Sequence, residues 1–180
     1  MTGDRTRVYP DEPAGPFEAP PRTVEDRADR TVEFRAVDED RTEDLVAMYR
    51  AFDPSDRAQG IPPVGEERIR EWVEQLLDEG VNVVARHDGG TVGHATLVPD
   101  APTDADSHEL AIFVLGDYQG AGIGTELLRT LLGEGARQGV DRVWLTVEPW
   151  NKPAIRVYEK VGFEPSGNDR FEREYSIRLA

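Results

Sequence analysis

The sequence has no cysteine, and in 180 residues it has only two lysines and three histidines. Without cysteine there is no disulfide, no thiolate nucleophile and no zinc–thiolate site. The histidines, His87, His94 and His108, lack the spacing of metal ligands, so we expect structural roles and no metal. No apolar run approaches the about 18 residues of a membrane span, and the N-terminus lacks a signal-peptide core, which predicts a cytoplasmic protein with no membrane partner.

Positive charge is scarce, since 21 basic residues face 36 acidic ones and the net charge is -15. Such a charge repels nucleic acid, so we expect no nucleic-acid partner. The acidic surface either attracts a cationic acceptor or is an adaptation to a very salty cytoplasm. The acids are spread along the whole chain and almost all basic residues are arginine, which favours salt adaptation and a halophilic, archaeal source. The charge therefore does not identify the substrate.

The pattern along the chain predicts a single domain behind an N-terminal arm. Residues 1–30 contain many prolines and no apolar periodicity, so we expect an irregular arm there. Over 31–180, alternation predicts strands and three-to-four spacing predicts helices. The expected order is strand 31–37, helices 45–52 and 69–77, a hairpin of strands 81–87 and 91–98, strand 108–115, helix 123–132, strand 143–148, helix 151–163 and strand 170–179. This order predicts a mixed α/β single domain.

A glycine-rich loop, DYQGAGIG, joins a buried strand to an apolar helix at residues 117–124. The first N–H groups of a helix lack intrahelical partners, and side-chain-free positions such as Gly120, Gly122 and Gly124 let a pyrophosphate approach them. Thr125 stands where the dinucleotide fingerprint needs glycine or alanine, and the lysine of a Walker loop is missing. The alternative is an ordinary strand-to-helix turn.

A second motif lies in NKPAIRVYEKVGF, residues 151–163. Asn151, Ala154 and Tyr158 are spaced by three and four, which places them on one helix face. Pro153 falls in the first turn, where its missing N–H costs little. Taken alone, Asn151 suits an N-cap and Tyr158 suits a core position.

Together, Q-x-x-G-x-G from Gln119 and N-x-x-A-x-x-x-Y-x-x-x-G-F from Asn151 resemble the GNAT family of acetyl-CoA-dependent N-acetyltransferases. The resemblance implies a central mixed sheet that opens in a V between two strands, with helices on both faces. It implies that the pantetheine arm of acetyl-CoA lies in the V, that the pyrophosphate binds loop N–H groups, and that Tyr158 is the general acid. The implied cofactor-binding residues are Ile112, Phe113, Val114, Gln119, Gly120, Ala121, Gly122, Ile123, Gly124, Thr125 and Asn151.

Acetyl transfer from a thioester to an amine also needs a base and a donor for the oxyanion. Glu109 is the only acid in the apolar run and its lead-in, so burial there would raise its pKa and suit it to act as the base. The alternatives are a glutamate that faces solvent and an ordered water as the base. The backbone N–H near Val114 is the expected oxyanion donor. Trp150, beside Asn151, either lines the cofactor groove or packs beneath it, and packing is the favoured placement.

The acceptor is the least defined part of the prediction. In proteins of this resemblance, the segment between the first two helices forms one wall of the acceptor site, here FDPSDRAQGIPPVG at 52–65. The run HELAIFVLGDYQGAGIG is also similar to the acetyltransferase domain of protein-lysine acetyltransferases. An amine-bearing small molecule and a protein lysine or N-terminus stay open as acceptors, and so do monomer and homodimer. The rival function is a non-catalytic acyl-CoA-binding sensor.

Overall fold

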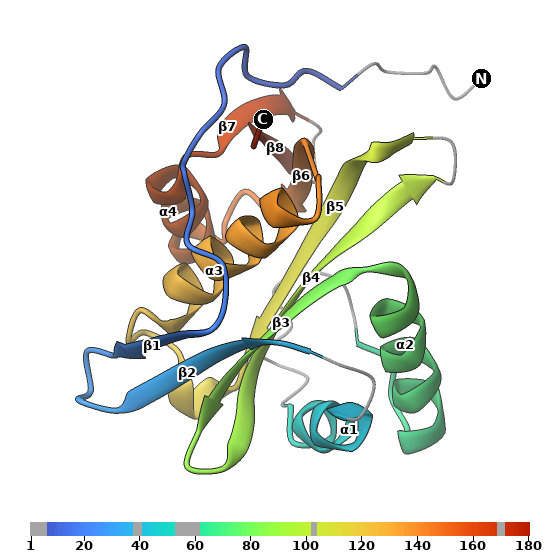
Figure 1. Cartoon of the computed structure of the whole chain (residues 1–180), viewed down its shortest axis with the longest axis vertical. Helices are drawn as coiled ribbons and strands as arrows, with labels where there is room; N and C mark the ends of the chain where they lie inside the picture. The colour runs from blue at the N-terminus through green and yellow to red at the C-terminus, as the bar shows by residue number, and fades with distance from the viewer. Residues whose placement is uncertain (1–6, 38–40, 53–61, 102–103, 169–171) are drawn as a thin grey trace.

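The computed structural model describes residues 7–37, 41–52, 62–101, 104–168 and 172–180. Helices and strands follow one another along a single mixed α/β chain (Figure 1). The helices are α1 (Thr42–Arg50), α2 (Glu66–Glu79), α3 (Ile123–Arg137) and α4 (Lys152–Val161), with a 3-10 turn η3 (Gly116–Tyr118). The strands are β1 (Arg22–Glu25), β2 (Thr31–Ala36), β3 (Val81–His87), β4 (Gly90–Ala101), β5 (Asp104–Val114), β6 (Arg142–Val147), β7 (Glu164–Asn168) and β8 (Arg173–Arg178).

The eight strands form one sheet in the order β1-β2-β3-β4-β5-β6-β8-β7. All neighbours are antiparallel except β5 and β6, which run parallel. The parallel pair is short: it joins only Ser107, His108 and Glu109 to Arg142, Val143 and Trp144. Beyond Glu109 the two strands diverge while β5 continues to Val114 beside β4. The sheet therefore opens in a V between β5 and β6, and the expected mixed sheet with this opening is confirmed.

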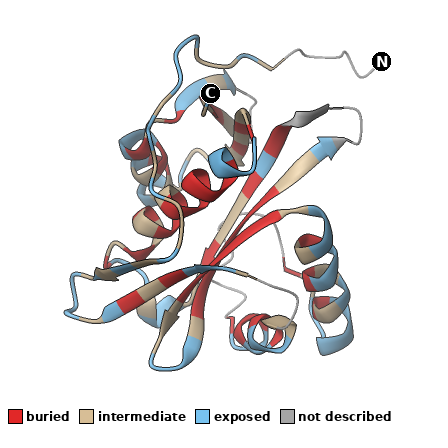
Figure 2. Ribbon diagram, viewed as in Figure 1, coloured by how far each residue is buried: buried red, intermediate tan, exposed pale blue. Residues whose placement is uncertain are grey.

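Helices cover both faces of the sheet, so the side chains of β5, which alternate between the faces, pack in two separate cores. Leu110, Ile112 and Val114 pack in the larger core with α3 and α4, and Ala111 and Phe113 pack in the smaller core with α1 and α2. Figure 2 shows the buried residues concentrated in the middle of the strands and along the inner side of α3. No described helix is long and apolar enough to cross a membrane.

The N-terminal arm is more ordered than its composition predicts. Figure 1 shows it running along α3 before it enters β1, and β1 pairs with β2 from Arg22 to Glu25. The irregular arm expected over 1–30 is therefore wrong for these four residues. The backbone N–H of Ala14 donates to the carbonyl of Arg178 over 2.8 Å. At Gly133 the arm lies so close that an added Cβ would stand 2.5 Å from the carbonyl carbon of Glu18.

Candidate active site

The glycine loop adopts a backbone that suits glycine. After η3, Gly120 has a φ of 77° and Gly122 a φ of 91°, a region that L side chains rarely adopt. Gly122 is the residue before α3, so the N–H groups of the first turn of α3 begin at Ile123. These groups have no intrahelical acceptor, and the helix dipole adds positive potential where they point. The loop therefore has the geometry of an anion-binding helix start, and its two left-handed positions need glycine.

The loop is fixed to the end of β5. The side-chain amide of Gln119 donates from Nε2 to the carbonyl oxygen of Val114 over 2.9 Å. An added Cβ at Gly124 would lie 4.0 Å from Cγ2 of Val114, so the first turn of α3 passes directly beside the strand end. Gln119 thus holds the glycine loop against the residue predicted to supply the oxyanion donor.

Beyond Glu109, the edge of β5 that faces the V pairs with no strand of the described chain, and the carbonyl of Val114 there accepts from Gln119. The N–H of Leu115 donates to the carbonyl of Val92 over 2.9 Å, so Leu115 points toward β4. Because neighbouring residues of a strand point their N–H and C=O groups in opposite directions, Ile112 and Val114 point toward β6. In the described part of the chain, β6 pairs with nothing on β5 beyond Glu109. The V therefore presents the backbone groups of Ile112 and the N–H of Val114 for an extended chain to pair with.

A cavity of about 540 Å³ lies where the loop, β5 and α4 meet. Gln119, Gly120, Gly122, Gly124 and Thr125 of the predicted set line it with Val114. Sequence reasoning missed the rest of the lining, which is Arg27, Pro153, Arg156, Val157 and Lys160. The four-residue spacing of the two α4 cations was a signal that these residues share one helix face. Nothing in the sequence indicated the cation from the arm.

The two predicted residues of α4 lie apart from this lining. Tyr158 is buried, 3% exposed, and its ring stands edge-on to Phe163 at 5.9 Å between centroids. Burial raises the pKa of the Tyr158 hydroxyl, so it holds its proton at neutral pH, as a general acid must. Asn151 caps α4, where its Oδ1 accepts the N–H of Ala154 over 3.4 Å. Trp150 is 67% exposed, so the expected packing beneath the groove is wrong.

Glu109 is the last residue of β5 that pairs with β6. Its side chain is solvent-exposed, as the alternative placement expected. Partial desolvation raises its pKa above the ordinary value, the neighbouring Asp100 and Glu172 raise it further, and Arg7 opposes them. Because the carboxylate reaches solvent, screening limits this rise. Glu109 is thus accessible to an acceptor at the point where the V begins.

A second cavity, of about 320 Å³, lies between α2 and the β4–β5 hairpin on the Glu109 side of the sheet. Its apolar lining is Trp72, Leu76, Val98, Ala111 and Phe113, and its polar lining is Gln75, Glu79, Thr96 and Glu109. The Thr96 hydroxyl is buried and has no hydrogen-bond partner among the described residues. Of the segment predicted as an acceptor wall, residues 53–61 lie outside the described residues.

The histidines are placed in two structural networks and on β5. His94 is fully buried and bonds Tyr49 through Nδ1 at 2.5 Å and Asn82 through Nε2 at 2.8 Å. His87 bonds the Tyr118 hydroxyl at 2.9 Å, next to the glycine loop. Among the described residues there is no group of three side chains that could hold a metal ion.

A family model described as the acetyltransferase (GNAT) family matches residues 42–163. The chain belongs to the GNAT family of acetyltransferases. An uncharacterized N-acetyltransferase of Mycobacterium tuberculosis is 37% identical over 121 residues, which cover 61% of this chain and 76% of that protein. The L-amino acid N-acetyltransferase AaaT of Escherichia coli is 35% identical over 111 residues, 59% of this chain and 67% of that protein.

Among solved structures, yncA of Salmonella typhimurium, described as an acetyltransferase with its cofactor acetyl-CoA, superposes with a TM-score of 0.67 at 19% identity, over 83% of this chain and 94% of that one. The superposition shows that the two chains share the fold. As a GNAT protein, this chain is an acyltransferase that moves an acetyl group to an amine, and the GNAT fold binds acetyl-CoA. These relatives are bacterial and do not address the expected halophilic archaeal source.

Proposed function

We propose that this acetyltransferase binds acetyl-CoA along the open edge of β5 and against the glycine loop. The observation that carries the proposal is the backbone of Ile112 and Val114, which points into the V beside the loop cavity. An extended, amide-bearing pantetheine arm suits such an edge, because it can pair with the strand as an added strand would. Phe113 stays a predicted contact, because its backbone groups point toward β4 and its side chain belongs to the smaller core.

The diphosphate of the cofactor is proposed to bind the N–H groups between Gln119 and Thr125. The two left-handed glycines and the start of α3 support this, since together they expose donors without side chains in the way. Ala121 and Ile123 contribute only through their backbone, because both side chains are buried. Asn151 stays a predicted contact, with its side chain engaged as the helix cap.

Three groups are proposed to carry the chemistry. The Glu109 carboxylate takes a proton from the acceptor ammonium, directly or through a water, so that the free amine attacks the thioester carbonyl. The Val114 N–H holds the oxyanion of the tetrahedral intermediate. The Tyr158 hydroxyl, which is protonated at neutral pH, donates its proton to the departing thiolate, and the second proton that the attacking nitrogen loses returns to Tyr158 through solvent. If an ordered water is the base instead, Glu109 orients it.

The acceptor is proposed to be a small amine with an apolar body. The cavity beside Glu109 supports this, because most of its lining is apolar and its charged lining among the described residues is acidic. Carboxylates such as Glu79 and Glu109 attract an ammonium group. The relative AaaT acts on L-amino acids, as its name states, which also favours a small acceptor over a protein lysine or N-terminus.

A panel of acceptors tests the proposal. Release of thiol from acetyl-CoA would be followed with phenethylamine and L-leucine as apolar amines, ethanolamine as the polar control, and a lysine peptide and a peptide with a free N-terminus. We expect the apolar amines to react fastest. Turnover confined to the peptides would contradict the small-amine proposal. Binding of acetyl-CoA without thiol release by any amine would favour the non-catalytic sensor.

A further inference from the structure

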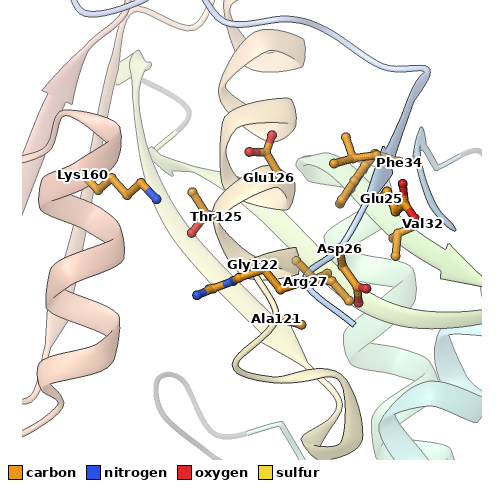
Figure 3. Close-up of a pocket in the computed structure, with 12 residues that line it drawn as sticks. Glu25, Asp26, Arg27, Val32, Phe34, Ala121, Gly122, Thr125, Glu126 and Lys160 are labelled. Carbon is orange, nitrogen blue, oxygen red and sulfur yellow. The ribbon is translucent and has the colours of Figure 1, made fainter. Parts of the chain in front are cut away.

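Three basic side chains converge on the cavity of the glycine loop in a chain of net charge -15. Arg27 comes from the turn between β1 and β2, and Arg156 and Lys160 come from one face of α4. Figure 3 shows Arg27 and Lys160 reaching toward Thr125 from opposite sides, at the start of α3. We call these three side chains the cationic seat.

The backbone of the arm fixes Arg27 in this place. Its N–H donates to the carbonyl of Ala121 over 3.0 Å, which ties the β1–β2 turn to the glycine loop. Its guanidinium lies over Gly122, where an added Cβ would stand 3.5 Å from Nε. Any side chain at position 122 would therefore meet Arg27 as well as strain the backbone.

The seat has cations without matching acids. Among the described residues, no carboxylate forms an ion pair with Arg27, Arg156 or Lys160. Two of the nearby acids are already engaged: Glu126 pairs with Arg22 at 3.0 Å and Asp26 with Arg30 at 2.7 Å. Like charges that converge repel one another, so this arrangement is favourable when an anion lies between them.

We propose that the cationic seat binds the phosphomonoester of acetyl-CoA, and that the N-terminal arm thereby selects the phosphorylated cofactor. This inference rests on the proposed function, in which the loop N–H groups already hold the diphosphate. A phosphomonoester carries a charge of about -1.5 to -2 and three acceptor oxygens at neutral pH. Arginine offers paired donors to such a group and lysine offers a point charge, so the seat matches it in charge and in geometry.

Calorimetry with acetyl-CoA and acetyl-dephospho-CoA, which lacks only the phosphomonoester, tests the inference. We expect the wild type to prefer acetyl-CoA by about 10- to 100-fold, the value of hydrogen bonds to a charged group. Arg27→Gln is expected to weaken acetyl-CoA binding by a similar factor and to leave the dephospho ligand nearly unchanged. Lys160→Gln is expected to do the same. Arg68→Gln removes an equal charge from the exposed surface of α2 and is expected to change neither affinity.

If the wild type bound both ligands with equal affinity, the seat would not bind the phosphomonoester and the inference would be overturned. An equal loss of affinity for both ligands in Arg27→Gln would overturn it as well. A thermal melt of each variant shows that the fold is kept, and Lys160→Gln gives a second reading from another element. Binding of neither ligand to the wild type would instead overturn the proposed function, and the inference with it.

Discussion

Tyr158 can act as a general acid or serve only as a packed residue of the core, and one substitution distinguishes the two roles. Its ring packs on Phe163 inside the larger core, and burial raises the pKa of its hydroxyl. Phenylalanine keeps the packing and removes the proton. If Tyr158 is the general acid, Tyr158→Phe lowers turnover by about 10²–10⁴-fold. Affinity for acetyl-CoA stays nearly unchanged, because the lost interaction belongs to the transition state. Steady-state kinetics beside calorimetry measures both.

Glu109→Gln is the comparison for that experiment. It also lowers turnover, but its loss shrinks as the pH rises, because an amine that is already free needs no base. Below the raised pKa of Glu109 the wild-type carboxylate becomes protonated, so its activity falls on the acid side of the profile. Full turnover of Tyr158→Phe, with a stability loss of about 1 kcal/mol from a lost hydrogen bond, would remove Tyr158 from the mechanism.

The sequence identified the residues whose role depends on local backbone and missed those placed by distant contacts. The glycine spacing predicted Gly120 and Gly122, and the structure gives both the positive φ that glycine permits. Arg27 lies almost a hundred residues earlier and reaches the same loop only because its backbone bonds Ala121. Trp150 shows the same limit, since an apolar residue beside a motif need not be buried.

Among the elements, the two strands that the sequence did not reveal are the two edges of the sheet. β1 is four residues long, and β7 reads EPSGN, with proline and glycine that central strands avoid. Edge strands pair on one side only, so their composition is less constrained than that of β3 or β5. The central strands and the four helices followed from alternation and spacing. The V could not be predicted from alternation and spacing, because the divergence of β5 from β6 depends on how the two strands pack together and not on the sequence of either strand alone.

A buried chain of hydrogen bonds links α1, α2, β3 and β4 next to the second cavity, which Leu76 also lines. Tyr49 donates to His94, His94 donates to Asn82, and Asn82 donates through Nδ2 to the carbonyl of Leu76 over 2.7 Å. Every polar group in this chain has a partner only if His94 is neutral. Burial lowers the pKa of His94 to about 3, which keeps it neutral.

Acid should therefore weaken the fold through His94. Between pH 6.5 and about 3 the unfolded chain binds a proton on this histidine that the folded chain does not, so stability falls as pH falls. Between pH 7 and pH 5, His94 accounts for a loss of about 2 kcal/mol in the free energy of unfolding. Denaturant unfolding of the wild type and of His94→Gln at both values measures it. We expect the variant to be less stable at pH 7 and to lose less on acidification. If the wild type and His94→Gln lost the same stability between pH 7 and pH 5, the result would contradict this prediction.

For the whole molecule, the net charge of -15 predicts how salt acts on stability. Surface ion pairs such as Arg70–Glu43 and Arg129–Glu126 contribute little to stability, because water screens them, and salt weakens them further. Self-repulsion among the excess acids acts over the whole surface, and salt relieves it. We expect the relief of self-repulsion to outweigh the weakening of ion pairs, so the melting temperature rises from low to multimolar potassium chloride. A flat or falling melting temperature would favour the alternative, in which the acids steer a cationic acceptor.

The arm along α3 also bears on how the protein is made. Residues 8–14 are translated long before their partners in β8: the carbonyl of Val8 accepts from the hydroxyl of Ser176, 168 residues further on, and Ala14 bonds Arg178. Contacts this far apart along the chain form slowly, because a long loop must close before they contribute. Residues 8–14 are thus translated well before they can be fixed, and a nascent chain that has not yet reached β8 lacks the partners of Val8 and Ala14.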